Sequence, residues 1–158
     1  MQRCNTRAGA CHSRRYLTLG SLHRRTPGCN RCRRVRSNSN PGYPCRVSLQ
    51  DAEVGEELLL VSFQHQPFAS PYRASGPIYV RRGAARRVLE PNQLTDCITR
   101  CLISVRGYNA VHMLLQAEIC RGGQVAAEIG RQFDDARIAY LHLHNAKPGC
   151  FSCRVERA

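Results

Sequence analysis

The stretch of sequence that decides the fold lies near the C-terminus, where residues 139–155 read AYLHLHNAKPGCFSCRV. Side chains on a strand alternate between its two faces, so Tyr140, His142 and His144 share one face and the intervening leucines share the other. Residues 145–149 contain Pro and Gly, which favour a tight turn before a second strand. The stretch therefore predicts a β-hairpin with one apolar and one polar face.

The simplest register of this hairpin defines a candidate site on the polar face. It pairs His144 with Cys150, His142 with Ser152, and Tyr140 with Arg154. An imidazole beside a thiol can remove the thiol proton, which makes Cys150 and His144 the candidates for nucleophilic chemistry, although no catalytic residue is assigned. The alternative is the wetter face of an antiparallel sheet, where His, Ser and Arg are ordinary residues.

Cys150 and Cys153 have the C-x-x-C spacing of a redox or zinc motif. Residues three apart on a strand point to opposite faces, so these two thiols cannot readily reach each other or share a metal ion. The alternation places Phe151, Cys153 and Val155 on the apolar face. We therefore predict that Cys153 is a small core residue.

The basic charge is concentrated at the N-terminus. Residues 1–40 carry ten Arg and no acid, whereas residues 41–158 contribute only +3 of the formal net charge of +13. Nucleic-acid affinity depends on clustered cations, so we do not expect the folded part of the chain to bind nucleic acid. No apolar run approaches the length of a membrane span, and we expect no membrane association.

Residues 1–34 form a basic segment rich in Arg and Cys that shows no helical or strand period, so we expect it to be irregular. Four functional interpretations compete for this segment: a nucleic-acid-binding tail, a secretory signal, an organellar transit peptide, and a zinc knuckle that uses Cys29 and Cys32 with His23 or Cys11. The short and broken apolar stretch of the segment disfavours the secretory signal. The alternative to all four is translation from a wrong reading frame, which the acid-free composition favours.

The pattern of residues 35–158 predicts a single α+β domain, mostly antiparallel sheet with two helices and a C-terminal β-hairpin. Strands are expected at 45–49, 57–63, 77–81, 102–106 and 111–119, with the odd-numbered residues of 111–119 facing inward, and helices from 91 and at 123–133. His65 follows the second of these strands, and Cys97 and Cys101 fall on the apolar side of the first helix. Scattered cysteines without a secretory signal favour reduced thiols and a cytoplasmic location.

Four segments resemble the bacterial domain-of-unknown-function family 1203: residues 43–49 (YPCRVSL), 70–80 (SPYRASGPIYV), 102–108 (LISVRGY) and 139–147 (AYLHLHNAK) with Gly149 and Cys150. The resemblance covers roughly residues 35–158, and it implies a shared fold and a bacterial cytoplasmic setting but no activity. The family's motif positions fall here on Cys45, His65, Tyr72, Arg73, His142, His144, Asn145 and Cys150.

Three classes of function remain open at this point. The first is a binding domain for a small anionic ligand, in which His142, His144, Asn145 and Cys150 join Arg73, whose guanidinium suits a carboxylate or phosphate. The second is an enzyme that uses either Cys150 with His144, or a metal ion held by His142, His144 and His65. The third is a structural or interaction protein. The sequence identifies neither a cofactor nor an oligomeric state.

Overall fold

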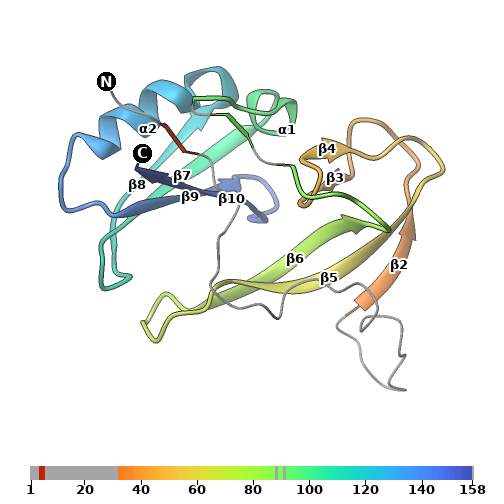
Figure 1. Cartoon of the computed structure of the whole chain (residues 1–158), viewed down its shortest axis with the longest axis horizontal. Coiled ribbons are helices and arrows are strands. Elements are labelled where there is room, and N and C mark those ends of the chain that lie inside the picture. Colours follow the sequence, from red (N-terminus) through yellow and green to blue (C-terminus); the bar gives the residue numbers. More distant parts are fainter. Residues whose placement is uncertain (1–3, 6–31, 88, 91, 158) are drawn as a thin grey trace.

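The computed structural model describes residues 4–5, 32–87, 89–90 and 92–157, and these residues form two five-stranded sheets (Figure 1). The C-terminal sheet has the order β1 (Cys4–Asn5), β10 (Phe151–Arg157), β9 (Tyr140–Asn145), β7 (Leu102–Tyr108) and β8 (Leu114–Arg121). The N-terminal sheet has the order β2 (Cys32–Arg36), β5 (Glu57–Gln66), β6 (Ala74–Arg81), β3 (Pro44–Cys45) and β4 (Gln50–Asp51). Every paired neighbour is antiparallel except β3 with β6.

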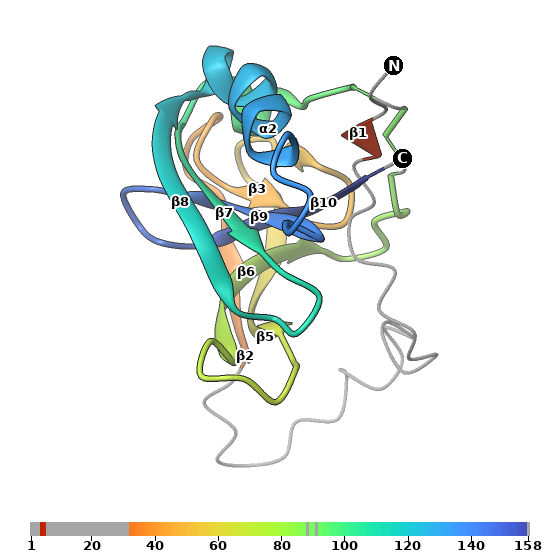
Figure 2. The ribbon, with the colours of Figure 1, turned by 90° about the vertical axis from the view of Figure 1, so that its left-hand side faces the viewer.

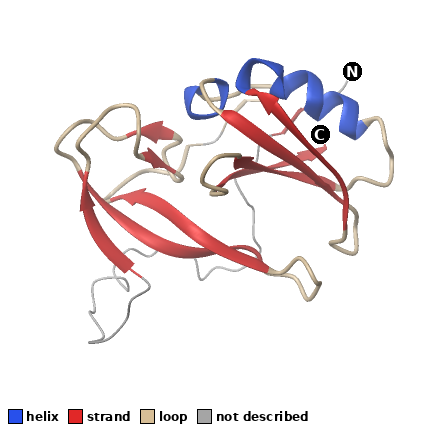
Figure 3. Cartoon of the chain, turned by 180° about the vertical axis from the view of Figure 1, so that it is seen from behind, coloured by secondary structure: helices blue, strands red, loops and turns tan. Residues whose placement is uncertain are grey.

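Three short helical elements of the described chain lie beside the C-terminal sheet, and the first of them also contacts β4 of the N-terminal sheet. They are α1 (Asp96–Thr99), the 3₁₀ turn η2 (Gly122–Gln124) and α2 (Val125–Phe133). Figure 2 shows α2 on one side of the C-terminal sheet, with β5 and β6 on the other side, and in Figure 3 none of the described helices covers the face of β5 and β6. The expected α+β class, mostly sheet with two short helices, is therefore confirmed. No helix in the described part of the chain is long and apolar enough to cross a membrane.

The hydrophobic core lies between α2 and the C-terminal sheet. Helix α2 buries Val125, Ile129 and Phe133, as its apolar period predicts. The sheet contributes Ile103, Val105, Leu141, Leu143, Cys153 and Val155. The prediction that Cys153 is a core residue is confirmed, since it is 2% exposed. Because Leu141 and Leu143 fill this core, the alternate residues of β9 must face the N-terminal sheet.

The expected register between the last two strands was wrong. β9 and β10 pair so that Phe151 lies opposite His144, one residue beyond the expected pairing, and a further register shift between Phe151 and Cys153 brings Arg154 opposite His142. A bulge of one residue reverses the alternation on one side of it. Phe151 therefore joins the histidine face, contrary to the prediction, while Cys153 remains in the core.

The apolar face of 111–119 was also assigned to the wrong side. The strand begins only at Leu114, because His112 has a φ of 64° in a turn whose Val111 and Met113 amides donate to the Asn109 side chain. β8 is an edge strand, and α2 packs on the face of the sheet opposite to Ile119. Val111 and Ile119 are consequently 69% and 58% exposed.

Several element boundaries differ from those expected. The strand at 45–49 is shorter, because the chain turns at Leu49 with a φ of 56°, and the first helix is limited to α1. β5 extends to Gln66, so that His65 lies within a strand rather than after it. β2 begins inside the segment expected to be irregular, where it pairs with β5. The knuckle candidates Cys11, His23 and Cys29 lie outside the described residues.

Candidate metal centre

Three histidines from both sheets converge between the sheets. His65 comes from β5, whereas His142 and His144 come from β9. The ring centroids are 5.0 Å apart for His65 and His144, 6.0 Å for His65 and His142, and 6.1 Å for His142 and His144. Each ring offers one nitrogen such that the three nitrogens lie within 4.8 Å of one another. The cluster joins two segments that are distant in sequence.

The face that carries these histidines is buried, which contradicts its interpretation as the wetter side of a sheet. His142 and His144 are each 1% exposed, because the N-terminal sheet covers this face of β9. The Phe151 ring stacks on the His65 ring, with centroids 5.1 Å apart and planes inclined by 4°. The Phe151 ring thus forms one wall of the cluster.

Burial keeps the three imidazoles uncharged. Desolvation, followed by the charge of the neighbouring histidine, lowers the pKa of His142 to about 2. Desolvation also lowers the pKa of His144 to about 4, and it lowers the pKa of His65. A neutral imidazole has a nitrogen lone pair free to bind a metal ion, so the cluster is in the ligating form at neutral pH.

The ring nitrogens of the cluster are largely without hydrogen-bond partners. His144 Nδ1 lies 3.0 Å from the Gly149 carbonyl oxygen, and donating to that oxygen leaves Nε2 as the free lone pair. Among the described residues, His144 Nε2, His65 Nδ1 and both ring nitrogens of His142 are buried with no partner. Each such atom costs about 1–3 kcal/mol of stability. Four buried ring nitrogens without partners in one cluster indicate a binding site for an atom that the protein itself does not supply.

A divalent metal ion fits this donor set. Histidine that binds zinc usually donates its other ring N–H to a carbonyl or carboxylate, as His144 does to Gly149. Zinc–nitrogen bonds of about 2.0–2.1 Å in a tetrahedral site place the nitrogens about 3.3 Å apart, so the rings must close by up to about 1.5 Å. Three protein ligands leave a fourth position open, which is the pattern of catalytic rather than structural sites.

The Tyr140 side chain on β9 lies next to the three histidines and takes part in a hydrogen-bond network. The Tyr140 hydroxyl accepts a hydrogen bond of 2.8 Å from Gln66 Nε2 and lies 3.0 Å from His112 Nδ1. The Tyr140 ring centroid is 5.3 Å from those of His142 and Tyr108. This network ties β9 to β5 next to His65, and it holds the two sheets together beside the cluster.

Sequence reasoning overlooked Arg106, which lies opposite His142 on the neighbouring strand β7. Its Nε donates to Ser104 Oγ at 3.2 Å. The signal that could have found it was the alternation of β7, which puts Ser104, Arg106 and Tyr108 on one face. This alternation indicates that Arg106 lies near the histidines only once β7 is known to pair with β9.

The other residues singled out from the sequence have contacts elsewhere. Arg73 and Tyr72 lie exposed in the loop before β6. The buried Cys45 Sγ accepts hydrogen bonds from the backbone N–H groups of Ser48 and Arg81, at 3.5 and 3.3 Å.

At the end of β9, Asn145 Oδ1 accepts a hydrogen bond of 3.4 Å from Ser152 Oγ. The Cys150 thiol lies 4.0 Å from the Pro148 carbonyl oxygen, and Phe151 occupies the position opposite His144 that Cys150 was expected to take.

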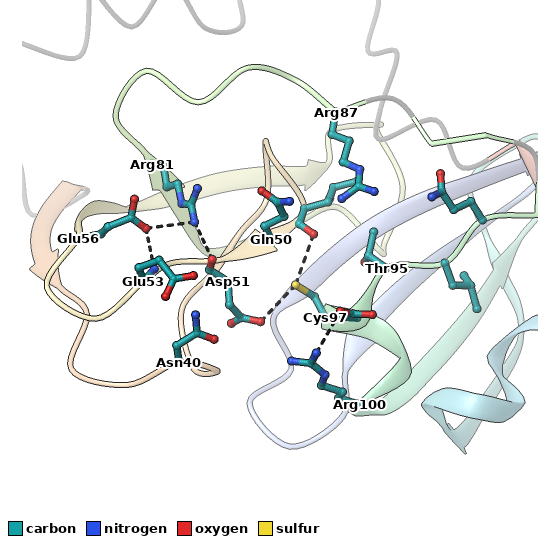
Figure 4. A pocket seen from close by; sticks show the side chains of 14 residues that line it. Asn40, Gln50, Asp51, Glu53, Glu56, Arg81, Arg87, Thr95, Cys97 and Arg100 are labelled. Carbon is teal, nitrogen blue, oxygen red and sulfur yellow. Dashed lines mark hydrogen bonds and ion pairs between the residues drawn. The ribbon is translucent and has the colours of Figure 1, made fainter.

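A cavity of about 560 Å³ lies apart from the histidines, between β4, α1 and the segment leading to α1 (Figure 4). Its charges are largely paired within its own walls: Arg81 pairs with Glu56 at 3.1 Å, and Arg100 pairs with Asp96 at 3.0 Å. The Cys97 thiol donates to the Asp51 carboxylate at 3.5 Å, and burial together with that carboxylate raises the pKa of Cys97 to about 11. The thiol is therefore protonated, and this cavity offers no activated group.

Comparison with protein families gave one match. A family model described as "Protein of unknown function (DUF1203)" matches residues 42–157, a range that includes all three clustered histidines. Comparisons with curated proteins and with solved structures gave no match.

Proposed function

The chain belongs to the DUF1203 family, whose function is unknown, and for this member we propose a function based on a mononuclear metal centre held by His65, His142 and His144. The metal ion is divalent and of the first transition row or zinc, because imidazole suits those ions. The observation that carries this proposal is the convergence of three neutral histidines whose buried ring nitrogens have no hydrogen-bond partners among the described residues.

The open fourth position supports a metal-dependent enzyme over a purely structural site. A metal ion held by three histidines can bind water at that position and lower the pKa of the water towards neutrality. Buried polar groups without partners weaken a fold, so a protein that used this region only for packing would be expected to carry apolar residues here.

The thiol-based alternative has less support. It requires the Cys150 thiol beside His144, whereas Phe151 takes the position opposite His144, with its ring centroid 5.6 Å from the His144 ring. A thiolate also needs a base that accepts a proton readily, and the low pKa of His144, about 4, makes it a weak base.

The test is titration of the metal-free protein, prepared without a histidine tag, with Co²⁺, which reports its ligand geometry through its visible absorption. We expect one Co²⁺ per chain, and at least tenfold weaker binding in each of His65→Asn, His142→Asn and His144→Asn. Arg82→Asn is the control, since Arg82 is exposed and follows β6, and the affinity of this variant should stay within about threefold of wild type. Wild-type affinity in His142→Asn would contradict the proposal.

A further inference from the structure

Arg106 lies beside the proposed metal centre, where its side chain can contact a ligand of the metal ion. It lies opposite His142 in the antiparallel pairing of β7 and β9, with Ser104 opposite His144 in the next row. The guanidinium Nε donates to Ser104 Oγ at 3.2 Å, which directs the half-buried side chain along the row towards His144. The charge of Arg106 contributes to the lowered pKa of His65, His142 and His144 alike, after desolvation.

A second arginine, Arg46, follows β3 of the N-terminal sheet. Desolvation is the main cause of the lowered pKa of His144, and the charge of Arg46 contributes to it as well. Among the described residues, neither Arg46 nor Arg106 forms an ion pair with a carboxylate. Arg154 differs from both, because it pairs with Glu156 at 3.0 Å and its guanidinium lies 4.0 Å over the Tyr140 ring.

The positive charges around the proposed metal centre favour the binding of an anion. Arg106 and Arg154 both lie opposite His142, and of these two only Arg154 has a carboxylate partner among the described residues. A divalent ion bound by neutral imidazoles beside the Arg106 guanidinium would gather three positive charges in a region shielded from water. Such an excess is costly unless an opposite charge accompanies it.

We propose that the open position of the metal centre takes a small oxyanion, a carboxylate or phosphate group, with one oxygen on the metal and another on the Arg106 guanidinium. This inference rests on the proposed metal centre and names the ligand class of that same site. The Arg106 guanidinium carries N–H donors beyond the Nε that donates to Ser104, so it can donate to the second oxygen of a metal-bound carboxylate or phosphate, an oxygen that a water molecule does not offer.

The experiment titrates the Co²⁺-loaded protein with acetate, with inorganic phosphate and with chloride, and follows the visible absorption of Co²⁺. We expect acetate or phosphate to change the spectrum with saturation at one anion per chain, and chloride to bind at least tenfold more weakly. The anion that saturates at the lower concentration identifies the source of the oxyanion group.

Arg106 and Arg154 lie on the two strands that flank His142, so matched variants of these two residues show which of them binds the oxyanion. Arg106→Gln should bind Co²⁺ within about threefold of wild type but bind the oxyanion at least tenfold more weakly, since a hydrogen bond to a charged group is lost. Arg154→Gln should leave oxyanion binding within about threefold. Arg106→Lys keeps the charge without the fork, so it should bind the oxyanion at least threefold more weakly even if Arg106→Gln does not fold.

The possible failures are distinguishable. Absence of stoichiometric Co²⁺ binding would overturn the metal centre and the inference with it. Stoichiometric Co²⁺ whose spectrum responds to neither oxyanion, or equal oxyanion affinity in wild type and both Arg106 variants, would overturn the inference alone.

Discussion

Lowering the pH of the metal-free protein from 7.5 to 5.0 should destabilise it strongly through two buried histidines. The folded-state pKa values of His142 and His144, about 2 and about 4, lie below the ordinary histidine value near 6.5. Neither histidine lowers the stability above pH 6.5, and stability is lost as the pH falls from 6.5 towards about 4 for His144 and about 2 for His142, because only the unfolded chain takes up protons in those ranges.

The size of the effect follows from the proton uptake. At pH 5.0 an unfolded histidine is almost fully protonated, whereas both buried histidines remain largely neutral, so each one lowers the free energy of unfolding by about 2 kcal/mol. Together His142 and His144 should remove about 4 kcal/mol, and His65, whose pKa is also lowered, acts in the same direction. A loss of this size is a large share of the stability of a typical domain.

Urea unfolding followed by circular dichroism, in the presence of a chelator at several pH values between 5.0 and 7.5, measures this loss. In His142→Leu the pH-dependent part should fall by about 2 kcal/mol, since one of the two titrating groups is gone. A total change below about 1 kcal/mol in the wild type, or an unchanged pH dependence in His142→Leu, would refute the argument that these rings are buried and neutral.

Two further predictions concern packing and buried hydrogen bonds. A Cβ on Gly122 would collide with backbone carbonyl oxygens of α1, so Gly122→Ala should lower the free energy of unfolding by about 2–3 kcal/mol. Gly123→Ala, which meets open space, should change it by less than about 0.5 kcal/mol; equal effects in urea unfolding would contradict the predicted collision. Tyr140→Phe removes the hydroxyl that accepts a hydrogen bond from the buried Gln66 amide, so it should lower the free energy of unfolding by about 1–3 kcal/mol. Tyr72→Phe, at an exposed position, should lower it by less than about 0.5 kcal/mol. Similar unfolding midpoints for the two variants would count against the Tyr140 network.

Much of the fold followed from local patterns. The alternation of residues 139–145 correctly separated Leu141 and Leu143 from His142 and His144, and the helical period correctly predicted the buried face of α2. These predictions depended only on neighbouring residues, whose side-chain directions are set by the backbone of one strand or one helix.

What the sequence did not reveal depends on contacts between distant segments. The turn before Phe151 puts Phe151 rather than Cys150 opposite His144, the bulge after Phe151 puts Phe151 and Cys153 on opposite faces, and no local pattern marks either feature. The burial of the histidine face depends on the second sheet, and β2 forms because β5 pairs with a segment that has no strand period of its own. Arg73 fitted the resemblance but lies exposed, whereas Arg106, which was overlooked, lies beside His142.

The most direct test of the metal centre is X-ray absorption spectroscopy of the protein loaded with one Zn²⁺ per chain. The structure predicts three imidazole nitrogens at about 2.0–2.1 Å, one further oxygen ligand, and weaker imidazole scattering in His142→Asn, which keeps only two of the three imidazoles. Zinc–sulfur scattering at about 2.3 Å would instead place the metal on cysteines, and it would contradict a centre made by His65, His142 and His144.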